Sequence, residues 1–160
     1  MLVGLVSDTH GLVRPEIFAA LAGVDLILHA GDVGGLAVLN ELSAIAPVRA
    51  VFGNTDSPGE PGLEARLLVE IEGVSIHVSH GHEVGAPTPQ KLLARYTADV
   101  IVYGHTHKPL IERFGPRLVV NPGAAGPRRF DLKSSVARLT VSQQQVEVEI
   151  VNLVPRSSNQ

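Results

Sequence analysis

The stretch LVGLVSDTHG, residues 2–11, decides the fold class, because the apolar run 2–6 is followed within four residues by Asp8 and His10. A short apolar run bounded by turn residues is typical of a strand buried on both faces. The same arrangement returns in DLILHAGD (25–32) and VRAVFGN (48–54), and helical patterns at 14–23 and 35–47 separate the three runs. This alternation predicts a βαβαβ unit, and therefore a parallel sheet covered by helices.

The rest of the chain is richer in strands. Two strand-like runs flank Glu72-Gly73 and predict a hairpin. The segment 88–96 is expected to be a helix that begins with a Thr-Pro pair in the N-cap and first helical positions, and 99–105 is another apolar run. Further strands, mostly antiparallel, are expected at 109–114, 117–121, 136–141 and 145–153. Two sheets packed face to face, with helices outside, would bury both sets of strands.

Composition sets limits on the class of protein. The chain has 160 residues, of which 44% are hydrophobic and 18% charged, and we expect one domain over 1–154 followed by a polar tail at 155–160. The net charge of −3 and the aromatic content of 4% argue against a surface for polyanions or single-stranded nucleic acid. The absence of cysteine excludes disulfides and thiolate zinc sites.

The location of the protein is also an expectation from composition. The N-terminal segment has no basic region and no cleavage signature of a signal peptide. No apolar run approaches the roughly 20 residues needed to span a bilayer. We therefore expect a cytoplasmic protein with no membrane contact. Apolar edge strands near the C-terminus would permit a homodimer.

Polar residues that could bind metal follow five of the expected strands. In open α/β sheets the carboxyl ends of the strands form the ligand crevice, so these residues should meet in one cluster. They are Asp8 and His10, His29 and Asp32, Asn54 and Asp56, His80 and His82, and His105 and His107.

Each of these residues also has an ordinary structural interpretation. Asp8 could form an Asx-turn or cap a helix, Asp32 and Asn54 are common turn residues, and a single histidine is often a satisfied polar group. Their joint occurrence after five strands favours a binding site. Imidazole and carboxylate ligands without thiols suit a pair of divalent cations, with Mn²⁺, Fe or Ni²⁺ favoured and Zn²⁺ possible, and one carboxylate must bridge the pair.

Five short motifs carry a resemblance to a known family. SDTHG, HAGD, GNTD, SHGH and GHTH resemble the ordered signature blocks of the calcineurin-like metallophosphoesterase superfamily. The chain length and NPGAAGPRR (121–129) resemble its small prokaryotic phosphodiesterase branch, the YfcE type. The resemblance implies an α/β fold: a four-layer αββα sandwich of two mixed β-sheets flanked by helices.

The resemblance also implies ligand roles and a reaction. Asp8, His10 and His107 would bind one cation, Asn54, His80 and His105 the other, and Asp32 would bridge the two. Mn²⁺ is the expected metal, with Ni²⁺, Fe or Zn²⁺ as alternatives. A hydroxide held between the cations would attack the phosphorus of a small phosphodiester in line, and no protein nucleophile is needed.

Other residues are assigned from their neighbourhood. Arg128 and Arg129 would clamp the substrate phosphate, although two solvated arginines after a turn is an equally good interpretation. Asp56 is expected to orient the cluster from behind. Many superfamily members have histidine after the metal-binding asparagine, whereas this chain has Thr55, which is not an effective general acid. The sequence therefore predicts a preference for diesters or activated esters.

His82 is the residue that could replace the missing proton donor, and we group it with Asp32 and Asn54 as a catalytic candidate. The alternative for His82 is a supporting role behind the metal ligands.

A non-catalytic scaffold, like the related subunit of the eukaryotic retromer coat, is the alternative function. That subunit has lost part of its metal set, whereas here all seven positions carry suitable ligands. A nucleotide-binding regulator is disfavoured, because no G-x-x-x-x-G-K-[ST] loop occurs.

Overall fold

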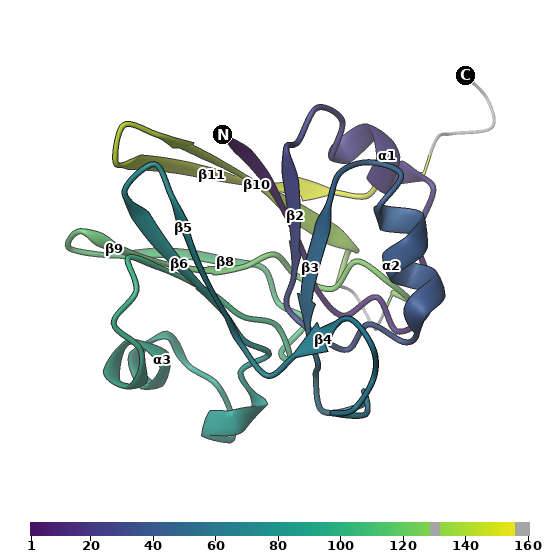
Figure 1. Cartoon of the computed structure of the whole chain (residues 1–160), viewed down its shortest axis with the longest axis horizontal. Coiled ribbons are helices and arrows are strands. Elements are labelled where there is room, and N and C mark those ends of the chain that lie inside the picture. Colours follow the sequence, from purple (N-terminus) through teal and green to yellow (C-terminus); the bar gives the residue numbers. More distant parts are fainter. Residues whose placement is uncertain (129–131, 156–160) are drawn as a thin grey trace.

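Two β-sheets lie face to face in the computed structural model, which describes residues 1–128 and 132–155 (Figure 1). The first sheet has six strands in the order β11-β10-β1-β2-β3-β4. Neighbouring strands from β1 to β4 run parallel, while β10 is antiparallel to both β1 and β11. The strands are β1 (Leu2–Val6), β2 (Leu26–His29), β3 (Val48–Val51), β4 (Leu63–Glu64), β10 (Ser135–Ser142) and β11 (Gln145–Asn152).

The second sheet has five strands in the order β5-β6-β7-β9-β8. Its three central strands are parallel and its two edge strands are antiparallel to their neighbours. The expectation of a mostly antiparallel second half is therefore wrong for the centre of this sheet, because a helical crossover between β6 and β7 allows parallel pairing. The strands are β5 (Leu67–Ile71), β6 (Val74–Val78), β7 (Val100–Val102), β8 (Leu110–Phe114) and β9 (Arg117–Asn121).

Short helices cover the two outer faces (Figure 1). α1 (Glu16–Ala20) and α2 (Leu36–Leu42) pack on the six-stranded sheet, and α3 (Pro89–Arg95) packs on the five-stranded sheet. The 3₁₀ turn η1 (His82–Val84) lies between β6 and α3. Thr88 caps α3 as expected, accepting a 3.2 Å hydrogen bond from the Lys91 N–H. The fold is the four-layer αββα sandwich of two mixed sheets that the resemblance implied.

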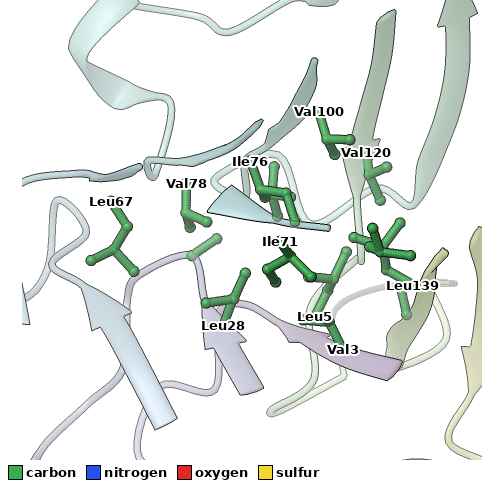
Figure 2. Close-up of a cluster of buried hydrophobic side chains, with 14 of the residues drawn as sticks. Val3, Leu5, Leu28, Leu67, Ile71, Ile76, Val78, Val100, Val120 and Leu139 are labelled. Atoms are coloured by element: carbon green, nitrogen blue, oxygen red, sulfur yellow. The ribbon is translucent and has the colours of Figure 1, made fainter. Parts of the chain in front are cut away.

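The main core fills the space between the sheets (Figure 2). Val3 and Leu5 of β1 point into this space, whereas Val6 packs on the opposite face with the side chains of α1 and α2. Because both faces of β1 are buried, its sequence is a continuous apolar run and not an alternating one. The facing sheet contributes Ile76 and Val100 among others (Figure 2).

Some elements differ from the expectation. α1 and α2 are shorter than the segments 14–23 and 35–47, because turns replace the last helical residues before Gly23 and Pro47. β4 was not predicted, since its segment is rich in Pro and Gly. None of the helices in the described part of the chain is long and apolar enough to cross a membrane.

Candidate metal centre

Side chains from loops after β1, β2, β6 and β7 meet at one edge of the sandwich. Asp8, His10 and His107 form a group whose potential ligand atoms all lie within 4.8 Å of one another. Asp8, Asp32 and His80 form a second such group. Because Asp8 belongs to both groups, the two lie directly side by side.

The backbone is left-handed at five of the seven residues expected to bind metal. Their φ angles are 53° for Asp8, 45° for His10, 53° for Asp32, 71° for His105 and 66° for His107. Such φ values are uncommon for residues with a Cβ and cost of order 1 kcal/mol or more each. Strain of this kind gathers at functional sites, where it aims side chains that a relaxed loop would point elsewhere.

The two oxygens of Asp8 have different surroundings. Oδ2 accepts hydrogen bonds from the Ser7 hydroxyl at 2.6 Å and from the His105 N–H at 3.1 Å. Oδ1 is buried and has no hydrogen-bond partner among the described residues. It lies 3.3 Å from His107 Nε2 and 3.7 Å from His10 Nε2. A buried, unpartnered carboxylate oxygen facing two imidazoles fits a cation between them.

Asp32 is arranged in the same manner, and it faces both groups, as does Asp8, whose Oδ1 lies 3.9 Å from His80 Nε2. Its Oδ1 accepts the Thr55 N–H at 2.9 Å. Its Oδ2 lies 3.7 Å from His10 Nε2 and 3.3 Å from His80 Nε2. One carboxylate oxygen is thus within reach of imidazoles from both groups, which is the geometry that a bridging ligand requires.

Asn54 and His105 extend the second group. Asn54 Oδ1 lies 3.0 Å from His80 Nε2 and 3.1 Å from His105 Nδ1, and the two ring nitrogens are 3.3 Å apart. The structure therefore brings all seven residues expected to bind metal together at one edge of the sandwich.

The tautomer of His80 supports this arrangement. Its Nδ1 donates a hydrogen bond to the Ala30 carbonyl at 2.8 Å, so in the neutral ring the lone pair is on Nε2. Nε2 then faces the carbonyl oxygen of Asn54, which is also an electron-pair donor. His80 Nε2 and Asn54 Oδ1 therefore face each other at 3.0 Å with a lone pair on each atom. Such a contact is favourable only when a proton or a metal cation lies beside both atoms.

Electrostatics favours charged carboxylates at this edge. Burial alone would raise the pKa of Asp8, but His10, His107, His80 and Ser7 outweigh burial and hold it far below its usual value. Burial is likewise overcome at Asp32, where His80 and the Thr55 N–H lower the pKa to about 2.

The same charges act on the imidazoles. Burial disfavours the charged ring of His80, but Asp32 and Asp8 overcome it and raise its pKa. The pKa of His105 is lowered by burial and by the neighbouring His80. Two ionised carboxylates beside several imidazoles make a site whose negative charge a divalent cation would neutralise.

Asp56 joins the loops that carry Asp32 and Asn54. Its carboxylate accepts the N–H groups of Val33 at 3.0 Å, Gly34 at 3.1 Å and Gly53 at 2.9 Å. These backbone groups lie next to Asp32 and Asn54, two of the residues expected to bind metal.

His29, which the sequence placed beside Asp32, lies behind the cluster and not in it. Its Nδ1 accepts the Gly31 N–H at 3.1 Å, so Nε2 carries the proton and donates to the Thr9 hydroxyl at 3.0 Å. Thr9 in turn donates to the Val33 carbonyl at 2.7 Å. Burial lowers the pKa of His29 to about 4, so the ring is neutral. This chain of hydrogen bonds holds the loop between Asp8 and His10.

Two glycines that the sequence analysis passed over leave room for the carboxylates. A Cβ on Gly53 would lie 2.1 Å from Asp32 Oδ1, and one on Gly104 would lie 2.7 Å from Asp8 Oδ2. Each glycine directly precedes a candidate ligand, Asn54 or His105. The signal was present in the sequence as the pairs Gly-Asn and Gly-His.

The remaining candidates are placed differently. His82 lies beside the second group, with its ring centroid 5.4 Å from that of His80 and 6.4 Å from that of His105. Arg128 is exposed and forms no hydrogen bond or ion pair with the described residues. Arg129 lies outside the described residues.

Comparison with known proteins agrees with this geometry. A family model described as the calcineurin-like phosphoesterase superfamily domain matches residues 1–144. A probable metallophosphoesterase of Methanothermobacter thermautotrophicus is 37% identical over 94% of this chain and 92% of its own length. The phosphodiesterase YfcE of Escherichia coli strain K12 is 31% identical over 78% of this chain and 79% of its own length.

A solved structure is also similar. The Vps29 protein of Entamoeba histolytica, crystallised in complex with zinc, is 25% identical and superposes with a TM-score of 0.77 over 96% of this chain and 100% of that chain. The family model covers most of the sequence, and the matched range contains the five motifs whose residues form the edge described above. The chain therefore belongs to the calcineurin-like phosphoesterase superfamily.

Proposed function

We propose that the protein is a phosphodiesterase that depends on two divalent cations and hydrolyses a small phosphodiester. The observation that carries this proposal is the position of Asp32 Oδ2, 3.7 Å from His10 Nε2 and 3.3 Å from His80 Nε2. A carboxylate oxygen shared by two ligand sets is what a dinuclear phosphoesterase needs. The similarity to YfcE, which is named a phosphodiesterase, supports the choice of a diester over a monoester.

The seven residues at the edge would divide into two ligand sets. In this proposal Asp8, His10 and His107 hold one cation, Asn54, His80 and His105 hold the other, and Asp32 holds both. The mixture of imidazole, carboxylate and amide oxygen favours Mn²⁺, with Ni²⁺, Fe or Zn²⁺ as alternatives. When bound, such cations lower the pKa of coordinated water and neutralise charge on a phosphate ester.

The protein's own groups would hold this arrangement in place. The Ser7 hydroxyl and the His105 N–H orient Asp8, and the Ala30 carbonyl orients the His80 ring. Because these partners are fixed before substrate arrives, little reorganisation accompanies the reaction. Asp56 orients the Asp32 and Asn54 loops through their backbone N–H groups.

His82 is the side chain that we place closest to the leaving group. Its ring lies next to His80 and His105, and its Nδ1 is 4.0 Å from Glu83 Oε1. The residue after Asn54 is Thr55, whose backbone N–H serves Asp32. Substrates whose leaving groups depart without a proton should therefore react fastest, with His82 assisting the others. We retain Arg128 and Arg129 as the groups that would clamp the substrate phosphate.

Metal reconstitution tests the proposal. The protein is stripped with chelator, and Mn²⁺, Ni²⁺, Zn²⁺ and Mg²⁺ are added back singly. Turnover of bis(p-nitrophenyl) phosphate is compared with that of p-nitrophenyl phosphate. We expect chelation to abolish activity, Mn²⁺ to restore it, and the diester to be the better substrate.

A matched pair of variants completes this experiment. Asp32→Ala should remain inactive with every metal, whereas Glu41→Ala, which removes an exposed acid on α2, should behave as the wild type. Activity that survives chelation would refute a metal-dependent reaction. Failure of all four metals to give turnover would favour the scaffold role instead.

A further inference from the structure

A hollow of about 540 Å³ opens on the outer face of the five-stranded sheet, next to the end of α3. Leu68 of β5 and His77 of β6 are paired across the sheet and both line it. Their chain neighbours Leu67, Ile76 and Val78 point into the core between the sheets, so Leu68 and His77 face outward. No residue of the candidate metal centre lines this hollow.

Two guanidinium groups stand at its walls, and that of Arg95 lies over the Tyr96 ring, with Cζ 5.6 Å from the ring centroid. Arg66 and Arg95 are exposed, and neither forms an ion pair or hydrogen bond with another described residue. No carboxylate belongs to the lining, although the protein as a whole has a net charge of −3. The hollow is thus a local concentration of positive charge on an acidic protein, and guanidinium groups bind phosphate with paired N–H donors.

A buried imidazole without a hydrogen-bond partner among the described residues lies in the floor of the hollow. His77 is 4% exposed, and neither of its ring nitrogens makes a hydrogen bond to a described residue. Burial lowers its pKa to about 4, so the ring is neutral and has one N–H. Nε2 is shut off from solvent, where an unsatisfied N–H would be costly, so the proton belongs on Nδ1. The Nδ1–H therefore has no acceptor among the described residues.

The walls of the hollow are held in place. Tyr96 stacks on His77 with ring centroids 3.7 Å apart. The Arg117 guanidinium donates to the carbonyls of Leu93 at 3.2 Å, Ala98 at 3.1 Å and Tyr96, which fastens the end of α3 to β9. A fixed wall lowers the entropic cost of binding a small ligand.

We propose that this hollow binds a phosphate group, with Arg66 and Arg95 supplying charge, and the His77 Nδ1–H and the Thr97 hydroxyl supplying neutral donors. The ligand is inorganic phosphate or a phosphomonoester, which present the same dianion. The exposed Leu68 side chain would add contact area for the organic part of an ester. This site is separate from the candidate metal centre and needs no cation.

The hollow is connected to the metal centre through one acid. The Tyr96 hydroxyl donates to Glu83 Oε2 at 2.7 Å, and Glu83 Oε1 accepts the Gly81 N–H at 2.9 Å. Gly81 lies between His80 and His82 in the chain. A ligand in the hollow should therefore change the environment of the segment that carries these two histidines. The amide of Gly81 can report this change.

Phosphate titration followed by ¹H–¹⁵N NMR tests the proposal. Inorganic phosphate and phenyl phosphate are titrated separately into the full chain, once with chelator and once loaded with diamagnetic Zn²⁺. We expect saturable shifts at the amides of Leu68, Arg95, Thr97 and Ala98 in both states, with smaller shifts at Gly81. Equal affinity for the two probes would assign the site to free phosphate, and tighter binding of phenyl phosphate would assign it to a phosphomonoester.

Two double variants of equal charge make the result specific. Arg66→Gln with Arg95→Gln should weaken binding at least about ten-fold, because both guanidiniums meet the dianion. Arg49→Gln with Arg113→Gln removes the same charge from exposed positions elsewhere and should leave the affinity unchanged. Equal weakening in both double variants, unchanged affinity in the first, or no saturable shift at the hollow without metal would overturn the proposal.

Discussion

The Thr55 N–H and the Asp32 carboxylate are joined by a 2.9 Å hydrogen bond that engages only Oδ1. The other oxygen, Oδ2, is left facing the imidazoles of His10 and His80. A residue that lacks the acid–base chemistry of histidine thus serves the site through its backbone. Thr55→His should therefore add a proton donor while keeping the backbone hydrogen bond to Asp32.

Replacement of Asp32 should remove both cations together. In the proposed centre, Asp32→Ala removes the oxygen that both cations would share, so metal content should fall from about two equivalents per chain to well below one. Elemental analysis after gel filtration measures this directly. Asp32→Asn keeps the acceptor for the Thr55 N–H and should fold as the wild type, yet bind metal weakly. Loss of a single equivalent in Asp32→Ala would contradict the bridging role.

The rate of hydrolysis should depend steeply on the leaving group. General-acid catalysis usually contributes about 10²–10⁴-fold to the rate. With threonine at position 55, we expect most of this contribution to be missing. For a series of aryl diesters, log kcat/KM should fall steadily as the pKa of the leaving phenol rises. Thr55→His should flatten that line by accelerating the poorest leaving groups. A line already flat in the wild type would show that a proton donor, with His82 the first candidate, acts in the native site.

The hydroxyl of Thr9 should matter to metal affinity although it touches no ligand atom. It accepts from His29 Nε2 and donates to the Val33 carbonyl, which holds the loop between Asp8 and His10. Thr9→Val keeps the shape but loses both hydrogen bonds, and should weaken metal binding about 10–100-fold. Thr9→Ser keeps the hydroxyl and should restore most of the affinity. Calorimetric titration with Mn²⁺ compares them, and equal affinities in Thr9→Val and wild type would disprove the effect.

Adding a methyl group to Gly53 should damage the metal centre. The new Cβ would lie 2.1 Å from Asp32 Oδ1 and 2.4 Å from the Asp32 N, so the carboxylate must move. Gly53→Ala should therefore lose metal affinity and activity. Gly59→Ala is the matched control, because a Cβ there meets nothing within 4 Å. The pair is compared by metal content and thermal midpoint, and a wild-type metal content in Gly53→Ala would count against the close approach.

Acid should destabilise the metal-free protein through His29. Burial lowers its pKa from 6.5 in the unfolded chain to about 4 in the folded one. The unfolded chain therefore takes up the proton first, so this stabilisation is complete above about pH 6.5 and is lost as the pH falls toward 4. Between pH 7 and pH 5 the share of this loss that comes from His29 should be about 2 kcal/mol, seen as the difference between wild type and His29→Gln. Urea unfolding at the two values measures it, and His29→Gln should lose less stability over that interval than wild type does.

Much of the architecture could be predicted from the sequence, because the apolar runs and the turn residues that follow them place the strand ends at the same positions. β1 and β2 are almost wholly buried, so their residues form continuous apolar runs that end in polar residues, and β3 keeps this pattern except at the exposed Arg49. Parallel pairing of β6 with β7 was less accessible, since it depends on a crossover and not on the composition of either strand. β4 was missed because two residues in a Pro- and Gly-rich segment carry no periodicity.

The candidate site, like the fold, has parts that could be predicted from the sequence and parts that could not. That five strand ends should converge followed from the parallel sheet, and the structure brings Asn54 and His105 within 3.1 Å across the two sheets. The function of His29 could not be read from its position, because burial and the tautomer decide it. Nor could the exposure of Arg128, which depends on the path of the loop after β9.

The left-handed backbone at Asp8, His10, Asp32, His105 and His107 has a consequence for how such proteins change over generations. At each of these positions glycine would relax the chain, and a screen that rewards heat resistance alone should collect glycine there. Lineages released from the need to bind cations would drift in that direction and become sturdier as they lose their chemistry. A demand for cation binding is therefore the force that would hold five side chains on so strained a backbone.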